Sequence, residues 1–235
     1  MMIRASFAKK KRLRYISHLE LLDTMRRAIR RADIPGEYSR GYNPTLNLSL
    51  SQPLPVGMPG GSEYLDLNLR ERIGAEKFVQ NLNLCLPAGI EILRAKFVGH
   101  DNLKSLQALV DRARYIIEPP LEDEDRGREL LQAFAEKDEL IITRKRRNKE
   151  DRDYDLRSMV HDIKMTTEGR WSFLVSTGSR GHVRPQEILQ GLRKIESELP
   201  EVPIVNFYRE GMYVSHMSQD DELLTPLAEE ILEER

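Results

Sequence analysis

The chain has 235 residues, enough for two small domains, and its 40% hydrophobic content is enough for a folded core. The formal net charge of −1 hides a basic segment over residues 1–40 and an acidic segment over residues 220–235, which suggests an anionic partner near the N-terminus. The single cysteine, Cys85, excludes an intrachain disulfide, a cysteine-rich zinc site and an iron–sulfur cluster within these residues.

The first hundred residues are predicted to follow the order β-α-β-β-α-β. Residues 2–7 alternate apolar and polar side chains and predict a strand. A helix is expected from Ser17, where Ser17 and Glu20 form a capping box, to the helix-breaking Pro35 and Gly36. The remaining expected elements are strands over 46–50 and 63–69, a helix over 74–86 and a strand over 89–99. This order is typical of a ferredoxin-like domain.

The second half is predicted to repeat this order with one strand too many. The expected elements are strands over 112–119, 139–145, 157–165 and 170–177, helices over 122–137 and 184–199, and a closing strand or a hairpin around Glu210-Gly211 over 204–214. We therefore predict an α+β protein with two tandem ferredoxin-like domains, the second carrying an extra strand or insertion. The predicted boundaries are a basic domain over 1–100, a second α+β domain over 110–216 and an acidic C-terminal tail over 217–235.

Basic residues crowd the connection between the first strand and the first helix. Clustered Lys and Arg neutralise phosphates and give salt-sensitive binding, and neighbouring tyrosines could stack on unpaired bases. The predicted RNA-binding residues are Lys9, Lys10, Lys11, Arg12, Arg14, Tyr15, Arg27, Arg30, Arg31, Arg40, Tyr42 and Asn43. A second basic loop covers residues 144–149. A solvated basic face, with Tyr15 and Tyr42 completing the core, is the alternative.

His18 is the candidate catalytic residue, as a general acid–base group. It lies in the first turn of a helix beside the basic loop, where positive charge and the helix dipole favour the neutral imidazole. The alternative is that His18 caps or packs against its own helix. The other histidines are scattered without metal-ligand spacing, so we expect neither a metal site nor a cofactor.

Two loops are candidate binding elements. Residues 176–185 run from a strand into a helix through Gly178, Ser179, Arg180 and Gly181, a geometry that can hold a phosphate, although many strand–helix connections favour Gly and Ser. Residues 41–61 carry no charge, and Pro53, Pro55 and Gly57 predict a rigid loop for a partner protein. No apolar run approaches the length of a membrane span and no signal-peptide core is present, so we expect a cytoplasmic location without membrane contact.

The stretch "RLRYISHLELLDTMRRAIRRADIPGEYSRGYNPTLNLSLSQPLPVG", followed by "EYLDLNL", resembles the bacterial radical-SAM-associated family of unknown function. The resemblance covers Arg4 to Leu69. That family continues its Asn-Pro turn with His-Pro-Lys, whereas here Asn43-Pro44 is followed by Thr45-Leu46-Asn47, which weakens a catalytic role for the loop. The resemblance implies partnership with a radical SAM enzyme and, from its usual gene neighbours, work on RNA or the ribosome.

Three functional hypotheses follow. The first is a non-catalytic or weakly catalytic accessory protein that presents RNA, or an RNA-containing particle, to a radical SAM partner through its basic N-terminal domain. The second is a metal-independent endoribonuclease with His18 as acid–base group and Arg14, Lys11 and Tyr15 around the phosphate, because the element order is similar to that of CRISPR RNA-processing endoribonucleases. The third is a protein adaptor that docks its partner through residues 43–57.

Overall fold

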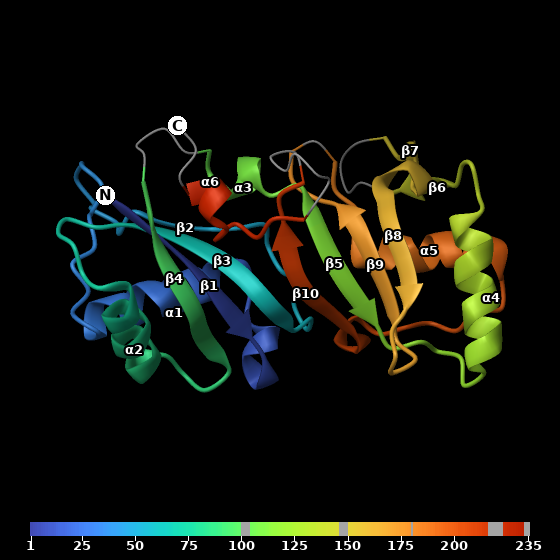
Figure 1. Cartoon of the computed structure of the whole chain (residues 1–235), viewed down its shortest axis with the longest axis horizontal. Coiled ribbons are helices and arrows are strands. Elements are labelled where there is room, and N and C mark those ends of the chain that lie inside the picture. The colour runs from blue at the N-terminus through green and yellow to red at the C-terminus, as the bar shows by residue number, and fades with distance from the viewer. Residues whose placement is uncertain (100–103, 146–149, 180, 216–222, 233–235) are drawn as a thin grey trace.

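The computed structural model describes residues 1–99, 104–145, 150–179, 181–215 and 223–232, and it shows an α+β protein built in two halves (Figure 1). The first half contains β1 (Met2–Lys9), the 3-10 helix η1 (Lys11–Tyr15), α1 (His18–Arg31), β2 (Leu48–Leu50), β3 (Gly60–Asn68), α2 (Ala75–Cys85) and β4 (Ile90–Val98). The predicted order of the first half is therefore observed.

The second half contains more elements than were predicted. They are α3 (Leu106–Leu109), β5 (Arg112–Ile117), α4 (Glu124–Ala135), β6 (Ile141–Arg144), β7 (Arg152–Asp155), the 3-10 helix η2 (Arg157–Met159), β8 (Val160–Met165), β9 (Trp171–Ser176), α5 (Pro185–Ile195), the 3-10 helix η3 (Ile204–Asn206), β10 (Phe207–Tyr213) and α6 (Glu229–Leu232). Strands β6 and β7 pair only with each other, so the segment predicted as a strand over 139–145 forms a hairpin outside the main sheet.

One mixed sheet runs through both halves in the order β4-β1-β3-β10-β5-β9-β8, and β2 also pairs with β3. Neighbouring strands are antiparallel except β3 and β10, which run parallel and meet where Arg209 lies opposite Gly60. The two halves share this sheet through one short parallel contact.

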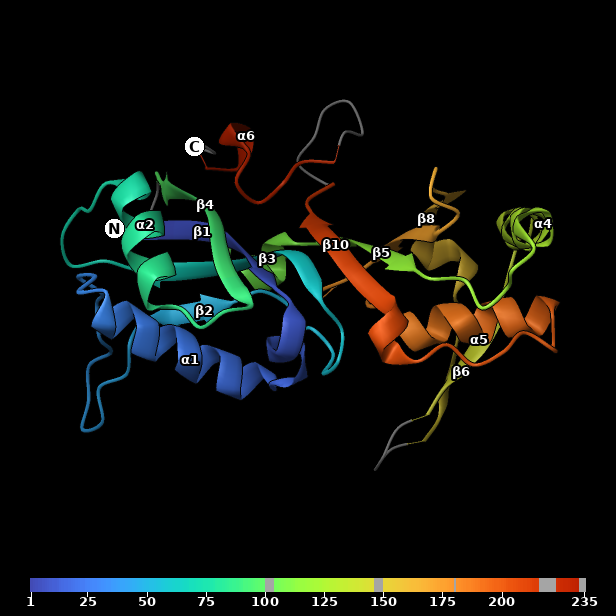
Figure 2. The same ribbon diagram turned by 90° about the horizontal axis from the view of Figure 1, so that it is seen from below.

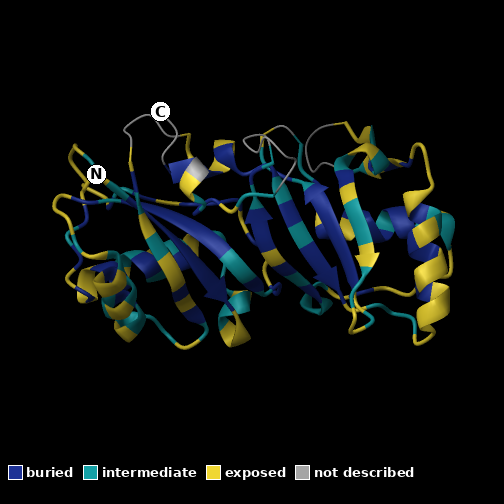
Figure 3. Cartoon of the chain, viewed as in Figure 1, coloured by how far each residue is buried: buried dark blue, intermediate teal, exposed yellow. Residues whose placement is uncertain are grey.

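Each half has its own hydrophobic core. In the first half, the apolar stripe of α1 at Leu21, Met25, Ala28 and Ile29 packs with the inward residues of β1 and β3. The second core surrounds the fully buried Trp171 and receives α4 and α5. Figure 3 shows the buried residues concentrated along the central strands, while many residues of the helices are exposed.

The C-terminal residues cover the sheet face opposite α1 (Figure 2). Ile231 and Leu232 are buried, and the Gly99 amide donates to the Leu232 carbonyl at 3.2 Å. The described part of the predicted acidic tail is therefore packed onto the first half through apolar side chains that an acidic composition does not reveal. Residues 217–222 and 233–235 of that tail lie outside the described residues.

Candidate binding site between the two halves

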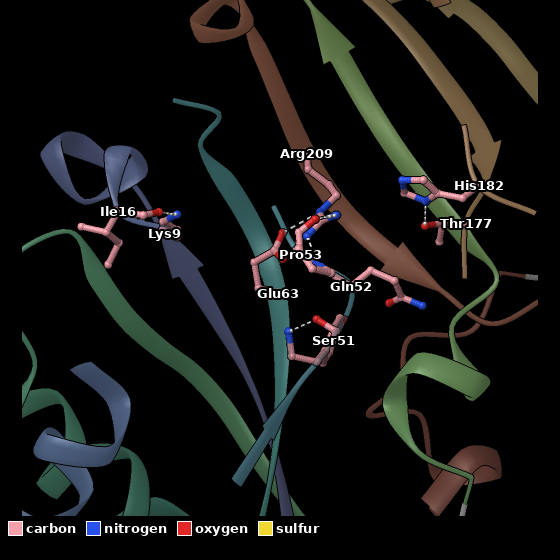
Figure 4. A network of polar contacts seen from close by, with 10 residues as sticks. Lys9, Ile16, Ser51, Gln52, Pro53, Glu63, Thr177, His182 and Arg209 are labelled. Carbon is pink, nitrogen blue, oxygen red and sulfur yellow. Dashed lines mark hydrogen bonds and ion pairs between the residues drawn. The ribbon is translucent and has the colours of Figure 1, made fainter. Parts of the chain in front are cut away.

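A buried ion pair ties the halves together beside the parallel contact of β3 and β10. The Arg209 guanidinium is fully buried and donates two hydrogen bonds to the Glu63 carboxylate. In one of them Arg209 Nε lies 2.8 Å from Glu63 Oε1. It also donates to the carbonyls of Gln52 at 2.8 Å and Pro53 at 3.3 Å. One side chain from the second half therefore fixes the loop between β2 and β3 in the first half (Figure 4). We call this loop, residues 51–59, the uncharged loop.

Sequence reasoning missed Glu63 and Arg209. Both occur in strands whose alternation is otherwise apolar on the inward face, with Leu65 and Leu67 following Glu63 and Phe207 preceding Arg209. A charge at an inward strand position is the signal that could have identified each residue, because buried charges require a partner. It could not have shown that they partner each other across 146 residues.

Lys9 was predicted to bind RNA, but its side chain is only 1% exposed. Its ammonium donates to the Ile16 carbonyl at 2.7 Å, which closes the turn before α1 (Figure 4). Burial lowers the pKa of Lys9, and Glu63 acts in the opposite direction. Lys9 is therefore a structural residue of the interior, and the predicted RNA surface begins at Lys10.

One exposed part of the basic segment consists of η1 and Lys10, which precedes it. Lys10, Lys11 and Arg12 are exposed, and the Arg14 guanidinium lies 4.9 Å from the centre of the Tyr15 ring. Tyr15 is itself 52% exposed. Among the residues that the structure describes, Lys10, Lys11 and Arg12 form no ion pair. We call Lys10–Tyr15 the basic turn.

The other predicted RNA-binding residues lie away from the basic turn. Arg27, Arg30 and Arg31 are exposed on α1, and Arg31 donates to the Cys85 carbonyl at 2.8 Å. Arg40, Tyr42 and Asn43 are exposed in the loop near the Asn68 end of β3, whereas the basic turn lies near its Gly60 end. The predicted site is thus divided along the length of α1. Residues 146–149 of the second basic loop lie outside the described part of the chain.

His18 occupies the first position of α1, and Ser17 and Glu20 form the predicted capping box. Burial lowers the pKa of His18, and the positive charges of Lys9 and Arg209 lower it further. The predicted neutral imidazole is therefore supported, although burial is the leading cause. The helix cap is Ser17, so His18 does not serve that purpose.

The predicted partner loop is divided between surface and interior. Pro53 is exposed and Pro55 half-buried, but Gly57 is buried. The Gly57 amide donates to the Arg14 carbonyl at 2.8 Å, at a φ of 93° that favours glycine. A Cβ at Gly57 would lie 3.0 Å from a methyl of Ile204. Gly57 thus has a structural role, which corrects its assignment to a partner surface.

The uncharged loop and the Gly-Ser loop of the second half meet in a pocket that neither sequence segment reveals by itself. Its volume is about 410 Å³, and we call it the junction pocket. Its lining residues are Gln52, Pro53, Gln107, Gly178, Ser179 and His182. At Gly178, φ is 86°, and a Cβ would lie 2.5 Å from the Val110 carbonyl oxygen, so glycine is needed for this close approach.

The polar groups of the junction pocket are held in place. Gln52 is 8% exposed, and its Nε2 donates to the carbonyls of Gln107 at 3.2 Å and Val110 at 3.3 Å. Gln52 Oε1 is buried and has no partner among the described residues, an arrangement that costs about 1–3 kcal/mol. His182 Nδ1 lies 3.0 Å from Thr177 Oγ1 (Figure 4). Burial lowers the pKa of His182, with Arg144 as the next cause.

Stability should decrease as the pH falls below about 6.5, the ordinary pKa of histidine. The pKa values of His18 and His182 are lowered in the folded protein, so the unfolded chain binds their protons first. Their contribution is therefore present above about pH 6.5 and is lost as the pH falls through their folded pKa values. Urea denaturation between pH 7.5 and 5.5 checks this, and His18→Gln with His182→Gln should flatten the dependence. An unchanged slope in that double variant would contradict the assignment.

These features define a class: an α+β protein with a large mixed sheet, a basic turn at one sheet end and a pocket between its halves. The model of a family described as an uncharacterized protein conserved in bacteria, DUF2344, matches residues 2–185, and the chain belongs to this family. No curated protein matches the chain. Within the described residues, no helix is long and apolar enough to cross a membrane, and no group of three potential metal ligands occurs.

Proposed function

We propose that this protein is an accessory protein of a radical SAM enzyme, and that it binds RNA or an RNA-containing particle through the basic turn. We further infer that its halves are two ferredoxin-like units, since their strand orders, β4-β1-β3-β2 and β10-β5-β9-β8, follow one pattern. The radical SAM partner comes from the sequence resemblance over Arg4 to Leu69. Because the chain has one cysteine, cluster chemistry belongs to that partner.

The exposure of the basic turn is the observation that carries the RNA proposal. Lys10, Lys11 and Arg12 have no acidic partner among the described residues, so they are available to phosphates and can release counterions. Tyr15 presents half of its surface beside them, and an exposed ring next to a cation suits an unpaired base. Single-stranded RNA fits this combination better than a regular duplex.

Changing Lys10, Lys11 and Arg12 together to Gln should weaken RNA binding and its dependence on salt. Each phosphate contact to a single strand contributes about 0.7 to the slope of log K against log salt, so three lost contacts should reduce it by about 2. Fluorescence anisotropy with a short single-stranded RNA across a salt series measures both quantities. The control is a variant in which Lys77, Lys137 and Lys194 are changed to Gln. These three lysines are exposed outside the basic turn, and the change in net charge is the same.

Equal slopes in the two triple variants would contradict RNA binding at the basic turn. Cleavage of the RNA by the wild type and not by His18→Ala would support the endoribonuclease hypothesis instead. Absence of RNA binding at low salt, with a partner protein retained, would support the adaptor hypothesis.

A further inference from the structure

We propose that the junction pocket binds one unpaired nucleobase. The proposal rests on the proposed function, because the base is taken to belong to the RNA whose phosphates contact the basic turn. A pocket of about 410 Å³ lies within the usual range for small-ligand sites, about 300–1,000 Å³. Among the described residues that line it, none is a carboxylate, a lysine or an arginine, which suits a neutral base. Arg180, which follows Ser179 in the same loop, lies outside the described residues.

The Gln52 amide supplies a fixed hydrogen-bond acceptor. Two main-chain carbonyls accept hydrogen bonds from Gln52 Nε2, which sets the orientation of the amide. Oε1 then has no partner among the described residues. Unpaired bases present amino or imino N–H groups on their edges. A base in the pocket therefore provides the donor that this buried oxygen lacks.

His182 and Pro53 supply the flat and apolar surfaces. His182 lines the pocket together with Gln52, and Figure 4 shows Thr177 at its Nδ1. Its Nε2 has no partner among the described residues and can bond to a second position on the base. Unpaired bases stack on aromatic rings, including that of histidine, and the exposed Pro53 ring lies at the pocket wall.

A single short loop connects the pocket to the basic turn. Pro53 lines the pocket, and four residues later the Gly57 amide bonds to the Arg14 carbonyl. Four residues span at most about 14 Å, a distance that a few nucleotides can cover. One strand of RNA can therefore place phosphates on Lys10–Arg12 and a base in the pocket.

The test compares a short single-stranded RNA with versions that carry one abasic nucleotide at each position in turn. For the wild type, loss of one particular base should weaken binding about tenfold. The Trp side chain of Ser179→Trp fills the pocket from an exposed position. In this variant, removing that base should no longer weaken binding, while the salt dependence of binding stays unchanged. The control Thr167→Trp lies at the other end of β9, in an equally exposed turn, and should behave like the wild type.

The outcomes separate this inference from the proposed function. Salt-dependent RNA binding that Ser179→Trp leaves unchanged at every abasic position would overturn the base pocket and keep the proposed function. If RNA does not bind, free nucleosides are added to labelled protein. Chemical shifts confined to residues around Gln52 and His182 would then support a pocket for a free nucleoside and reject the RNA proposal. No response to RNA or nucleosides would overturn both.

Discussion

Replacing Arg209 by Leu is expected to lower the free energy of unfolding by about 3–5 kcal/mol, because it leaves the Glu63 carboxylate buried without its partner. Glu63 is 3% exposed, so water cannot replace the lost guanidinium. The Gln52 and Pro53 carbonyls lose a donor in the same step. Chemical denaturation of wild type and variant measures the difference.

The double variant Arg209→Leu with Glu63→Leu distinguishes a buried pair from a generally sensitive position. Replacing both charges removes the unpaired carboxylate, so most of the lost stability should return. The matched control is Arg128→Leu, whose exposed pair with Asp125 should contribute less than about 1 kcal/mol. A loss of stability in Arg209→Leu no larger than in Arg128→Leu would contradict the assigned role.

Loosening of the uncharged loop should accompany this loss of stability. Arg209 connects β10 to the main-chain carbonyl of Gln52 near the start of this loop. The loop also lines the junction pocket and is hydrogen-bonded to the basic turn. Arg209→Leu should therefore weaken RNA binding even under conditions in which the variant is fully folded. The effect is indirect, because the Arg209 guanidinium is fully buried, cannot contact RNA and acts by holding the loop in place.

Local features of the fold could be predicted from the sequence because they depend on neighbouring residues. The capping box at Ser17 and Glu20 and the buried stripe of α1 both follow from helical spacing. The hairpin of β6 and β7 could not be placed, because alternation identifies a strand without identifying its partner. The same limit hid the continuity of the sheet, which depends on Arg209 meeting Gly60.

The candidate site shows the same division between local and distant information. Both pocket loops were noticeable, one for its lack of charge and the other for Gly178 and Ser179. Their meeting depends on segments more than a hundred residues apart, which no spacing rule describes. Lys9 shows the converse error. A run of four cations predicted one surface, whereas β1 is buried along its whole length from Ile3 to Lys9 and takes the first of these cations into the interior.

Replacing Arg4 by Leu should cost a comparable 3–5 kcal/mol and should also release the C-terminal segment. Arg4 is fully buried and makes two hydrogen bonds to Asp66, at 2.7 Å and 2.9 Å. It also donates to the Pro226 carbonyl at 3.3 Å, which holds residues 223–232 against the sheet. The substitution thus removes both the partner of a buried carboxylate and a direct bond to this segment.

Hydrogen exchange separates the local effect from the global one, with Arg209→Leu as the matched control. Both variants lose a buried arginine, but Arg4 donates a hydrogen bond to the C-terminal segment at Pro226, whereas Arg209 donates to Glu63, Gln52 and Pro53. Exchange through local opening does not follow global stability, so the Leu224 and Leu232 amides should exchange faster in Arg4→Leu than in Arg209→Leu under native conditions. Both amides are hydrogen-bonded in the wild type, to Val214 and Ala228. Equal exchange in the two variants would show that apolar packing of Ile231 and Leu232 holds the segment without help from Arg4.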